Sequence, residues 1–473
     1  MWINEKLRRV PSAINDSANR RTFLRQTAKG SVAVACGASL RSQLLMAARQ
    51  EGGHPLAPVP SHFPAGAQNL IIVNLTGGLS HIDSFDYKPR LQADHGKTLD
   101  WRGRPFFVNA SPFKFSPRGE NNLMVSELFP HLGNIVDDLA IIRSMYNDHI
   151  SHGQATLSMH CGLTTIPMPS LGSWISYGLG TQNLDLPPFV VLAAKLPYMG
   201  NQVWDSSFLP AYHTGTRLIP GNDPVPYLKS PIESVSLRAL EQAMLQKMNQ
   251  RHLKDSQLDP QLRARMSTFA TAAGMMKLAP QVLDVHSETR ETLADFGIGS
   301  GDNQSIAWQL LAARRLVENG VRVVEVVHTG SGANWDSHGD MQHHRQRAND
   351  LDRPLAALIL DLKKRGLLEE TLVVICTEFG RAPAGTKNEK GRNHHNSAFT
   401  CMLAGGGVRA GAIYGKSDEY GNLVAENMVH VHDLHATILH LMGLDHERLT
   451  YRFGGRDFRL TDVHGQVVKQ ILT

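Results

Sequence analysis

The sequence has few cysteines and no long apolar run. Its 473 residues include only four cysteines, at positions 36, 161, 376 and 401, which is too few for a disulfide framework. No segment reaches the roughly 18 uninterrupted apolar residues that a membrane-spanning helix needs, so we expect no stable membrane insertion. Internal repeats and low-complexity tracts are absent as well.

Most of the chain also lacks a basic excess. The net charge is +5, but residues 1–48 alone hold eight Lys or Arg and two acidic residues. Without this segment 40 basic and 41 acidic residues remain, so the rest of the chain is nearly neutral. A nearly neutral body has no electrostatic footprint for DNA, and we expect no nucleic-acid partner.

The basic segment has the organisation of an export signal. Residues 19–25 read NRRTFLR and are followed by a short, weakly apolar run at 30–40 and by small residues at 46–48. This order resembles a twin-arginine signal peptide, and a basic amphipathic helix is the alternative. We therefore expect residues 1–48 to be a signal read by the twin-arginine translocase, and the mature protein to be periplasmic or secreted.

Short β-type runs alternate with helical segments in the rest of the chain. Residues 49–68, rich in Gly, Pro and Ala, are expected to be a linker to one domain at 69–450, with a helical insertion at about 230–320 and a C-terminal tail at 451–473. Strands are expected at 70–75, 139–143, 189–193, 321–328, 372–377 and 399–403, and long helices at 236–253, 304–319, 341–365 and 433–442. This alternation predicts an α/β fold whose mostly parallel central sheet is sandwiched by helices.

Residues of the metal-ligand types lie where the predicted strands end. They form five groups: His81, Asp83 and Asp86; His149 and His152; Asp336 and His338; Glu378; and His394 with His395. Taken singly, each residue could be a surface histidine or an acid that caps a turn. Parallel sheets place their sites at the carboxyl ends of the strands, so we expect the groups to converge. Mixed Asp, Glu and His ligands suit Zn, Mn or Fe, and a carboxylate-rich portion could hold Ca or Mg.

Four motifs in this order resemble a known family. They are TGGLSHIDSFD at 76–86, WDSHG at 335–339, EFGR at 378–381 and GRNH at 391–394. Together they are similar to the bacterial domain of unknown function 1501, which is described as sulfatase-like and belongs to the alkaline phosphatase superfamily. The resemblance implies an alkaline-phosphatase-like sheet with a one- or two-metal site for phosphate or sulfate esters.

The resemblance also implies particular metal ligands. Asp336 and His338 resemble the Asp/His pair of one site, and Glu378 falls where the second site has an aspartate, with Phe379 in place of the usual histidine. The full set of implied ligands to a divalent ion (Zn, Mn or Ca) is His81, Asp83, Asp336, His338, Glu378 and His394.

One part of the sulfatase pattern is missing. No Cys/Ser-x-Pro-x-Arg motif, which carries the sulfatase nucleophile, occurs in the chain, so the formylglycine mechanism is not supported. Alignment of 161–163 with the end of the corresponding sulfatase helix places His152 at the nucleophile position, as nucleophile, ligand or general acid/base. Thr156, one helical turn further on, is the second candidate nucleophile.

Two arginines indicate the kind of substrate. Arg143 and Arg381 could bind an anionic ester as bidentate forks, although Arg381 could also be a solvated loop residue. We expect an exported, metal-dependent hydrolase of sulfate or phosphate esters, with an anionic ester such as a sulfated polysaccharide as substrate and with His152, Thr156 and Arg381 in catalysis. The alternative is a catalytically inactive, metal-stabilised binding or scaffold protein on the same fold.

Overall fold

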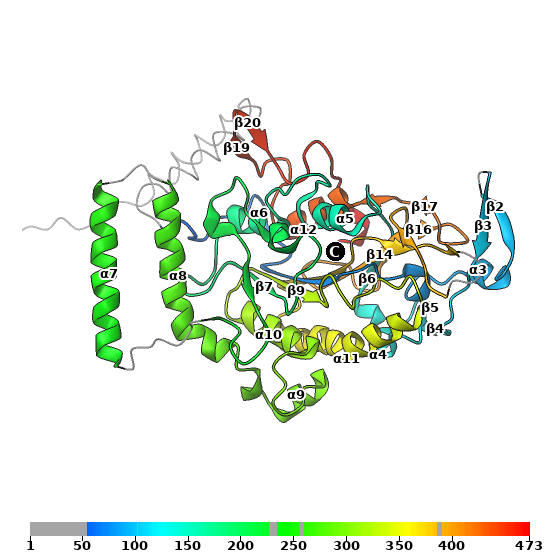
Figure 1. The fold of residues 1–473 in the computed structure, drawn as a ribbon, viewed down its shortest axis with the longest axis horizontal. Coiled ribbons are helices and arrows are strands. Elements are labelled where there is room, and N and C mark those ends of the chain that lie inside the picture. The colour runs from blue at the N-terminus through cyan, green and yellow to red at the C-terminus, as the bar shows by residue number, and fades with distance from the viewer. Residues whose placement is uncertain (1–53, 102, 227–233, 256–259, 386–389) are drawn as a thin grey trace, which may run out of the picture.

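The β-type runs of the sequence form one central sheet with helices on both faces (Figure 1). The structure, a computed structural model, describes residues 54–101, 103–226, 234–255, 260–385 and 390–473. The signal expected at 1–48 and the first part of the expected linker lie outside the described residues. The predicted α/β fold class, with a mostly parallel sheet between helices, is confirmed.

The order of strands brings several strand ends to one edge of the sheet. The order is β15-β6-β14-β10-β1-β9-β7-β8, with β18 paired to β6. The strands are β1 (Asn69–Leu75), β6 (Ala140–Tyr146), β7 (Phe189–Leu192), β8 (Thr216–Leu218), β9 (Val323–His328), β10 (Thr371–Cys376), β14 (Phe399–Ala404), β15 (Ile413–Tyr414) and β18 (Val429–His430). β1 lies parallel between β9 and β10, whereas β14 runs antiparallel to both β10 and β6. Because β14 is reversed, the loop that precedes it arrives at the edge where its parallel neighbours end.

Alternate residues of β1 enter two different cores. Ile71, Val73 and Leu75 belong to one core and Leu70 to the other, because successive side chains of a strand point to opposite faces. The first core includes α4 (Pro130–Asn134), α8 (Pro260–Val282), α9 (Arg290–Phe296), α10 (Ile306–Glu318) and α11 (Gln342–Lys364), and the second includes α5 (His152–Cys161), α6 (Leu171–Leu179) and α12 (Val431–Leu441). Burial on both faces explains why the strand is apolar along almost its whole length.

The long helices lie close to where the sequence predicted them. The helix expected at 236–253 is α7 (Val235–Asp255), and the one expected at 433–442 is α12. The chain turns after α12 at Gly443, whose φ of 74° suits a glycine. Within the described ranges, no helix has both the length and the apolarity that crossing a membrane would require.

Smaller elements complete the described chain. They are α3 (Pro89–Ala93) and the short strands β2 (Thr98–Trp101), β3 (Arg104–Val108), β4 (Phe115–Arg118), β5 (Leu123–Ser126), β11 (Gly380–Arg381), β12 (Ala384–Gly385), β13 (His394–His395), β16 (Lys416–Ser417), β17 (Val424–Glu426), β19 (Tyr451–Phe453) and β20 (Arg456–Phe458). The segment expected to be a C-terminal tail contains the β19–β20 hairpin, and its Val468 and Ile471 are buried in the second core. The C-terminal segment therefore packs on the domain.

Candidate metal centre

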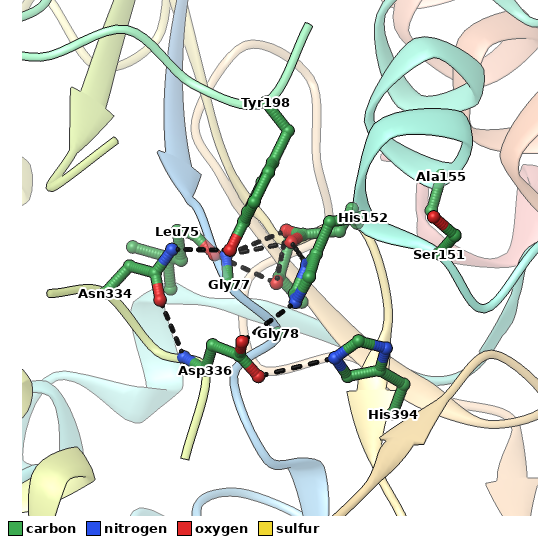
Figure 2. Close-up of polar contacts among 12 residues, drawn as sticks. Leu75, Gly77, Gly78, Ser151, His152, Ala155, Tyr198, Asn334, Asp336 and His394 are labelled. Atoms are coloured by element: carbon green, nitrogen blue, oxygen red, sulfur yellow. Dashed lines mark hydrogen bonds and ion pairs between the residues drawn. The ribbon is translucent and has the colours of Figure 1, made fainter. Parts of the chain in front are cut away.

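Asp336 is the centre of a histidine cluster at the carboxyl edge of the sheet. Its Oδ1 lies 3.0 Å from His338 Nε2 and 3.3 Å from His394 Nε2, and its Oδ2 lies 3.4 Å from His152 Nε2. Figure 2 shows the imidazoles of His152 and His394 directed at this carboxylate. One ligand atom each of His152, Asp336 and His394 lies within 4.8 Å of the other two, a spacing that could hold one metal ion.

Three different parts of the chain supply these residues. Asp336 lies in the loop after β9, and His152 is the first residue of α5, which follows β6. His394 lies in β13, just before the reversed strand β14. The cluster therefore depends on the strand order, and above all on the direction of β14.

Glu378 orients His152 from outside the cluster. It lies just beyond β10 and accepts the Gly77 N–H with both oxygens, at 2.9 and 3.2 Å. His152 Nδ1 lies 2.6 Å from Glu378 Oε1. Because the Glu378 carboxylate accepts hydrogen bonds here, Nδ1 carries the hydrogen, and Nε2 presents its lone pair to Asp336. This Nε2 is buried, and no group in the described part of the chain donates a hydrogen bond to it.

The other two imidazoles are held in the same way. His394 Nδ1 lies 2.8 Å from the carbonyl oxygen of Ile150, and His338 Nδ1 lies 3.2 Å from Oδ1 of Asn393. Both partners are oxygen acceptors, so each Nδ1 carries the hydrogen and each Nε2 is left with a lone pair. The two Nε2 atoms are only 2.9 Å apart. Two lone pairs at this distance repel each other unless a proton or a metal ion lies between them.

The pKa values of His152 and Asp336 show the same need for a positive charge. Burial alone would lower the pKa of His152, but hydrogen bonds and charges from Asp336 and Glu378 outweigh it, and the pKa is raised. Burial would raise the pKa of Asp336, but His152, His394 and Arg381 outweigh it, and the pKa is lowered. The carboxylate therefore stays ionised and attracts either protons onto the imidazoles or a cation between them.

Arg381 contacts Asp336 from the protein interior. Its guanidinium is fully buried and donates to Asp336 Oδ1 at 2.6 Å. It also donates to the carbonyl oxygens of Gly78 and Arg392, each at 3.1 Å, and to that of Gly77. Because all three guanidinium nitrogens donate to protein oxygens, binding a substrate anion as the sequence suggested would require Arg381 to break some of these bonds.

Two supporting residues were not foreseen from the sequence. The Tyr198 ring stacks on His152 with the ring centroids 4.2 Å apart and the planes 7° from parallel (Figure 2). Asn334 donates to Tyr198 Oη and accepts the backbone N–H of Asp336, both at 3.0 Å. Tyr198 lies in the loop after β7, at the same edge of the sheet, but a tyrosine is not among the Asp, Glu and His types that marked the other groups.

The structure does not bring His81 and Asp83 into the cluster. Both are fully buried in a short 3₁₀ helix, η1 (His81–Asp83). Asp83 Oδ2 lies 2.6 Å from Nε of Arg392, and His81 Nε2 lies 2.8 Å from the carbonyl oxygen of Gly421. His81 Nδ1 is buried without a hydrogen-bond partner among the described residues, but neither His81 nor Asp83 forms an ion pair or hydrogen bond with Asp336 or with the three imidazoles there. The geometry therefore does not support the expectation that His81 and Asp83 bind the metal.

The remaining candidates form no hydrogen bond or ion pair with the cluster among the described residues. Thr156 is buried on α5, and its Oγ1 has no hydrogen-bond partner among the described residues. Arg143 lies 3.7 Å from Asp86 and forms no ion pair with the cluster within the described ranges. His149 and His395 hydrogen-bond to backbone groups. Of the nine predicted site residues, the structure gathers His152, Asp336, His338, Glu378, Arg381 and His394.

The chain is similar to one family model and to several solved structures. A family model described as "Protein of unknown function (DUF1501)" matches residues 67–472, and no curated protein matches the chain.

Among solved structures, the lipoteichoic acid synthase LtaP of Listeria monocytogenes is 11% identical, with 85% of this chain and 78% of that chain covered and a TM-score of 0.36. The PsFucS1 sulfatase of Pseudoalteromonas sp. is 13% identical (86% and 71% covered, TM-score 0.34), and the phosphonate monoester hydrolase SpPMH of Silicibacter pomeroyi is 11% identical (80% and 73% covered, TM-score 0.33). These likenesses are too distant to assign an activity.

Proposed function

This chain belongs to the DUF1501 family, and we propose that it is an exported, metal-dependent hydrolase of sulfate or phosphate esters. One observation carries the proposal. Three imidazole Nε2 atoms face the carboxylate of Asp336, and each of the three rings has its Nδ1 bound to an oxygen acceptor outside the cluster. Histidines that bind a metal are oriented in this way by their outer hydrogen bond.

The donor set suits some metals better than others. His152, Asp336 and His394 would hold the ion with His338 beside them, which offers three nitrogens and one carboxylate. This set fits Zn²⁺ or Mn²⁺, whereas Ca²⁺ prefers a shell of oxygens. When bound, such an ion polarises an ester oxygen and lowers the pKa of an attacking water.

The protein residues around the ion have separate tasks in this proposal. Glu378 keeps the hydrogen of His152 on Nδ1, so that the lone pair of Nε2 is available to the metal ion. Arg381 donates a hydrogen bond to the carboxylate of Asp336 and balances its negative charge. The rings of Tyr198 and Phe379 contact His152 and exclude water from it. The export part of the proposal is based on the arginine-rich motif at 19–25. The choice of an anionic ester as substrate is based on the resemblance to the sulfatase-like family.

Metal content and turnover test the proposal together. The purified chain is assayed by elemental analysis, and with 4-nitrophenyl sulfate and 4-nitrophenyl phosphate after addition of Zn²⁺ or Mn²⁺. We expect about one or two bound ions and turnover of at least one ester. Asp336→Asn should lose both, whereas His343→Gln, which changes an exposed histidine outside the cluster, should lose neither.

The outcome also decides between hydrolase and scaffold. Bound metal without turnover of either ester would favour the alternative of a metal-stabilised binding protein. Absence of both metal and turnover would contradict the proposed function.

A further inference from the structure

A cavity lies at the same edge of the sheet as the candidate metal centre. It has a volume of about 560 Å³ and is bounded by the N-terminal end of α10, by α11 and by the loop after β9. α10 and α11 lie side by side against the sheet (Figure 1). Gly332 and Ala333 line the cavity, while Asn334 and Asp336 of the same loop belong to the metal centre. One loop therefore borders both sites, at the edge where α/β sheets bind ligands.

The cavity wall contains a buried acceptor with no partner. Gln309 on α10 is 4% exposed, and its Nε2 donates to the carbonyl oxygen of Ser305 at 3.4 Å. Its Oε1 is buried and has no hydrogen bond within the described residues. Buried amide oxygens are rarely left unpaired, so a ligand hydroxyl that reached this atom from the cavity would complete its hydrogen bonding.

Two donors line the same cavity. His328 Nδ1 accepts from Nε1 of Trp335 at 3.1 Å, and burial lowers the pKa of His328 to about 3. The ring is therefore neutral and carries its hydrogen on Nε2. The charge of Arg347 also acts on His328, and the one ion pair of Arg347 among the described residues is with Asp350 at 3.6 Å. This long contact leaves most of the guanidinium free to bind an anion.

The remaining charges of the cavity leave room for an anionic ligand. Lys195 is exposed at the cavity and adds a second positive charge. Asp302 also lines the cavity, but it accepts hydrogen bonds from the backbone N–H and the hydroxyl of Ser305. Asp350, which pairs with Arg347, and Arg353, which donates to backbone carbonyl oxygens, line the cavity as well. A ligand is thus offered cationic donors, beside two carboxylates that already have partners, and a separate neutral acceptor.

We propose that this cavity binds a sulfated sugar residue of an extended substrate, with its anionic group at Arg347 and His328 and a hydroxyl at Gln309. The inference rests on the proposed function, because it names the substrate class of the same enzyme as a sulfated oligosaccharide. The ester at the metal centre and the residue in the cavity would belong to one chain that passes over the loop from Thr329 to Asp336.

Direct binding tests the inference apart from turnover. The probe is a fluorescent sulfated hexasaccharide prepared from carrageenan, compared with the same hexasaccharide after desulfation. All proteins carry Asp336→Asn to prevent cleavage. We expect Arg347→Gln and Gln309→Leu each to weaken binding of the sulfated probe about tenfold or more. The parent should bind the desulfated probe no more tightly than these variants bind the sulfated one. Arg345→Gln, on the same helix but outside the cavity lining, is the matched control and should bind as the parent does.

A blocking variant guards against misfolding. A Cβ at Gly332 meets no atom within 4 Å, so Gly332→Phe adds a ring at the cavity without a clash at its base. It should abolish binding while its thermal unfolding stays at that of the parent.

The binding results decide the inference separately from the turnover of aryl esters. Equal binding by the parent and by all three cavity variants, or no binding by the parent, would overturn the inference even if aryl esters are hydrolysed. Cavity-dependent binding would uphold the cavity as a sulfated-sugar site even if no aryl ester is hydrolysed and the proposed function fails.

Discussion

His152 Nε2 and Asp336 Oδ2 face each other at 3.4 Å, with the hydrogen of the imidazole held on the opposite nitrogen by Glu378. An unprotonated ring nitrogen beside a carboxylate repels it, so the arrangement requires a proton or a metal ion between the two atoms.

Glu378 should tune the metal site without being a ligand. In Glu378→Gln the negative acceptor for His152 Nδ1 is lost, and the amide can donate instead of accept. We expect metal affinity to fall by about 10- to 100-fold, as for other changes to the outer partner of a metal-binding histidine. Metal titration measures this, with the exposed Glu369→Gln as control. Complete loss of metal binding would show that Glu378 is itself a ligand, as its place in the sequence suggested.

The stacked ring of Tyr198 should support His152. Tyr198→Phe keeps the stack and loses only the hydrogen bond from Asn334, whereas Tyr198→Leu loses both. Because an aromatic pair contributes about 0.5–1.5 kcal/mol, we expect Tyr198→Leu to weaken metal binding roughly two- to tenfold more than Tyr198→Phe. Equal effects of the two substitutions would mean that the hydroxyl, and not the ring, matters.

The buried pair of Asp83 and Arg392 should stabilise the fold. Removing one partner, as in Asp83→Asn or Arg392→Met, leaves a buried charge unpaired or a buried polar group unsatisfied, and should lower the free energy of unfolding by about 3–5 kcal/mol. The double variant should cost less than the sum of the two. Urea unfolding measures all three, and strict additivity would contradict a direct interaction.

The same pair should be sensitive to acid. Burial raises the pKa of Asp83, but Arg392 and Ser80 outweigh it, and the pKa lies below the ordinary value of 3.8. A pKa that is lower in the folded state stabilises it fully above the unfolded value, and this stabilisation is lost as the pH falls through the folded value. The difference in stability between the wild type and Asp83→Asn should therefore be constant above about pH 5 and shrink below pH 4. A difference that grows towards acid pH would contradict the lowered pKa.

Thr156→Val separates a structural threonine from a nucleophile. The hydroxyl is buried without a partner among the described residues, and valine replaces it with a methyl group of similar size. We expect stability to stay the same or rise by about 1 kcal/mol, with metal content and turnover unchanged. Loss of turnover with normal metal content would instead identify Thr156 as the nucleophile.

Local sequence predicted the sheet because burial on both faces leaves a clear pattern. The apolar run from Leu70 to Leu75 is a strand with its residues in two cores, as such a run implies. The strand-end rule then placed Asp336 and His338 at the correct edge. It found His394 only through the loop before β14, and that loop reaches the site because β14 runs antiparallel to its neighbours.

The partners of each polar side chain could not be derived from the sequence. Asp83 and Asp336 both follow buried strands, but Asp83 pairs with Arg392, which is 309 residues away, and Asp336 faces three imidazoles. Arg381 was expected at the substrate and instead donates to protein oxygens.

The sequence by itself therefore determined the fold class, the strands and the edge of the sheet at which chemistry is placed, since periodicity and strand ends are local properties of the backbone. Only the tertiary structure decided which of the candidate side chains meet, because long-range pairing of charges and hydrogen bonds depends on strand order and direction. For Asp336 the result is a carboxylate faced by the Nε2 atoms of His152, His338 and His394, and this convergence makes a candidate metal centre of residues that were separately unremarkable.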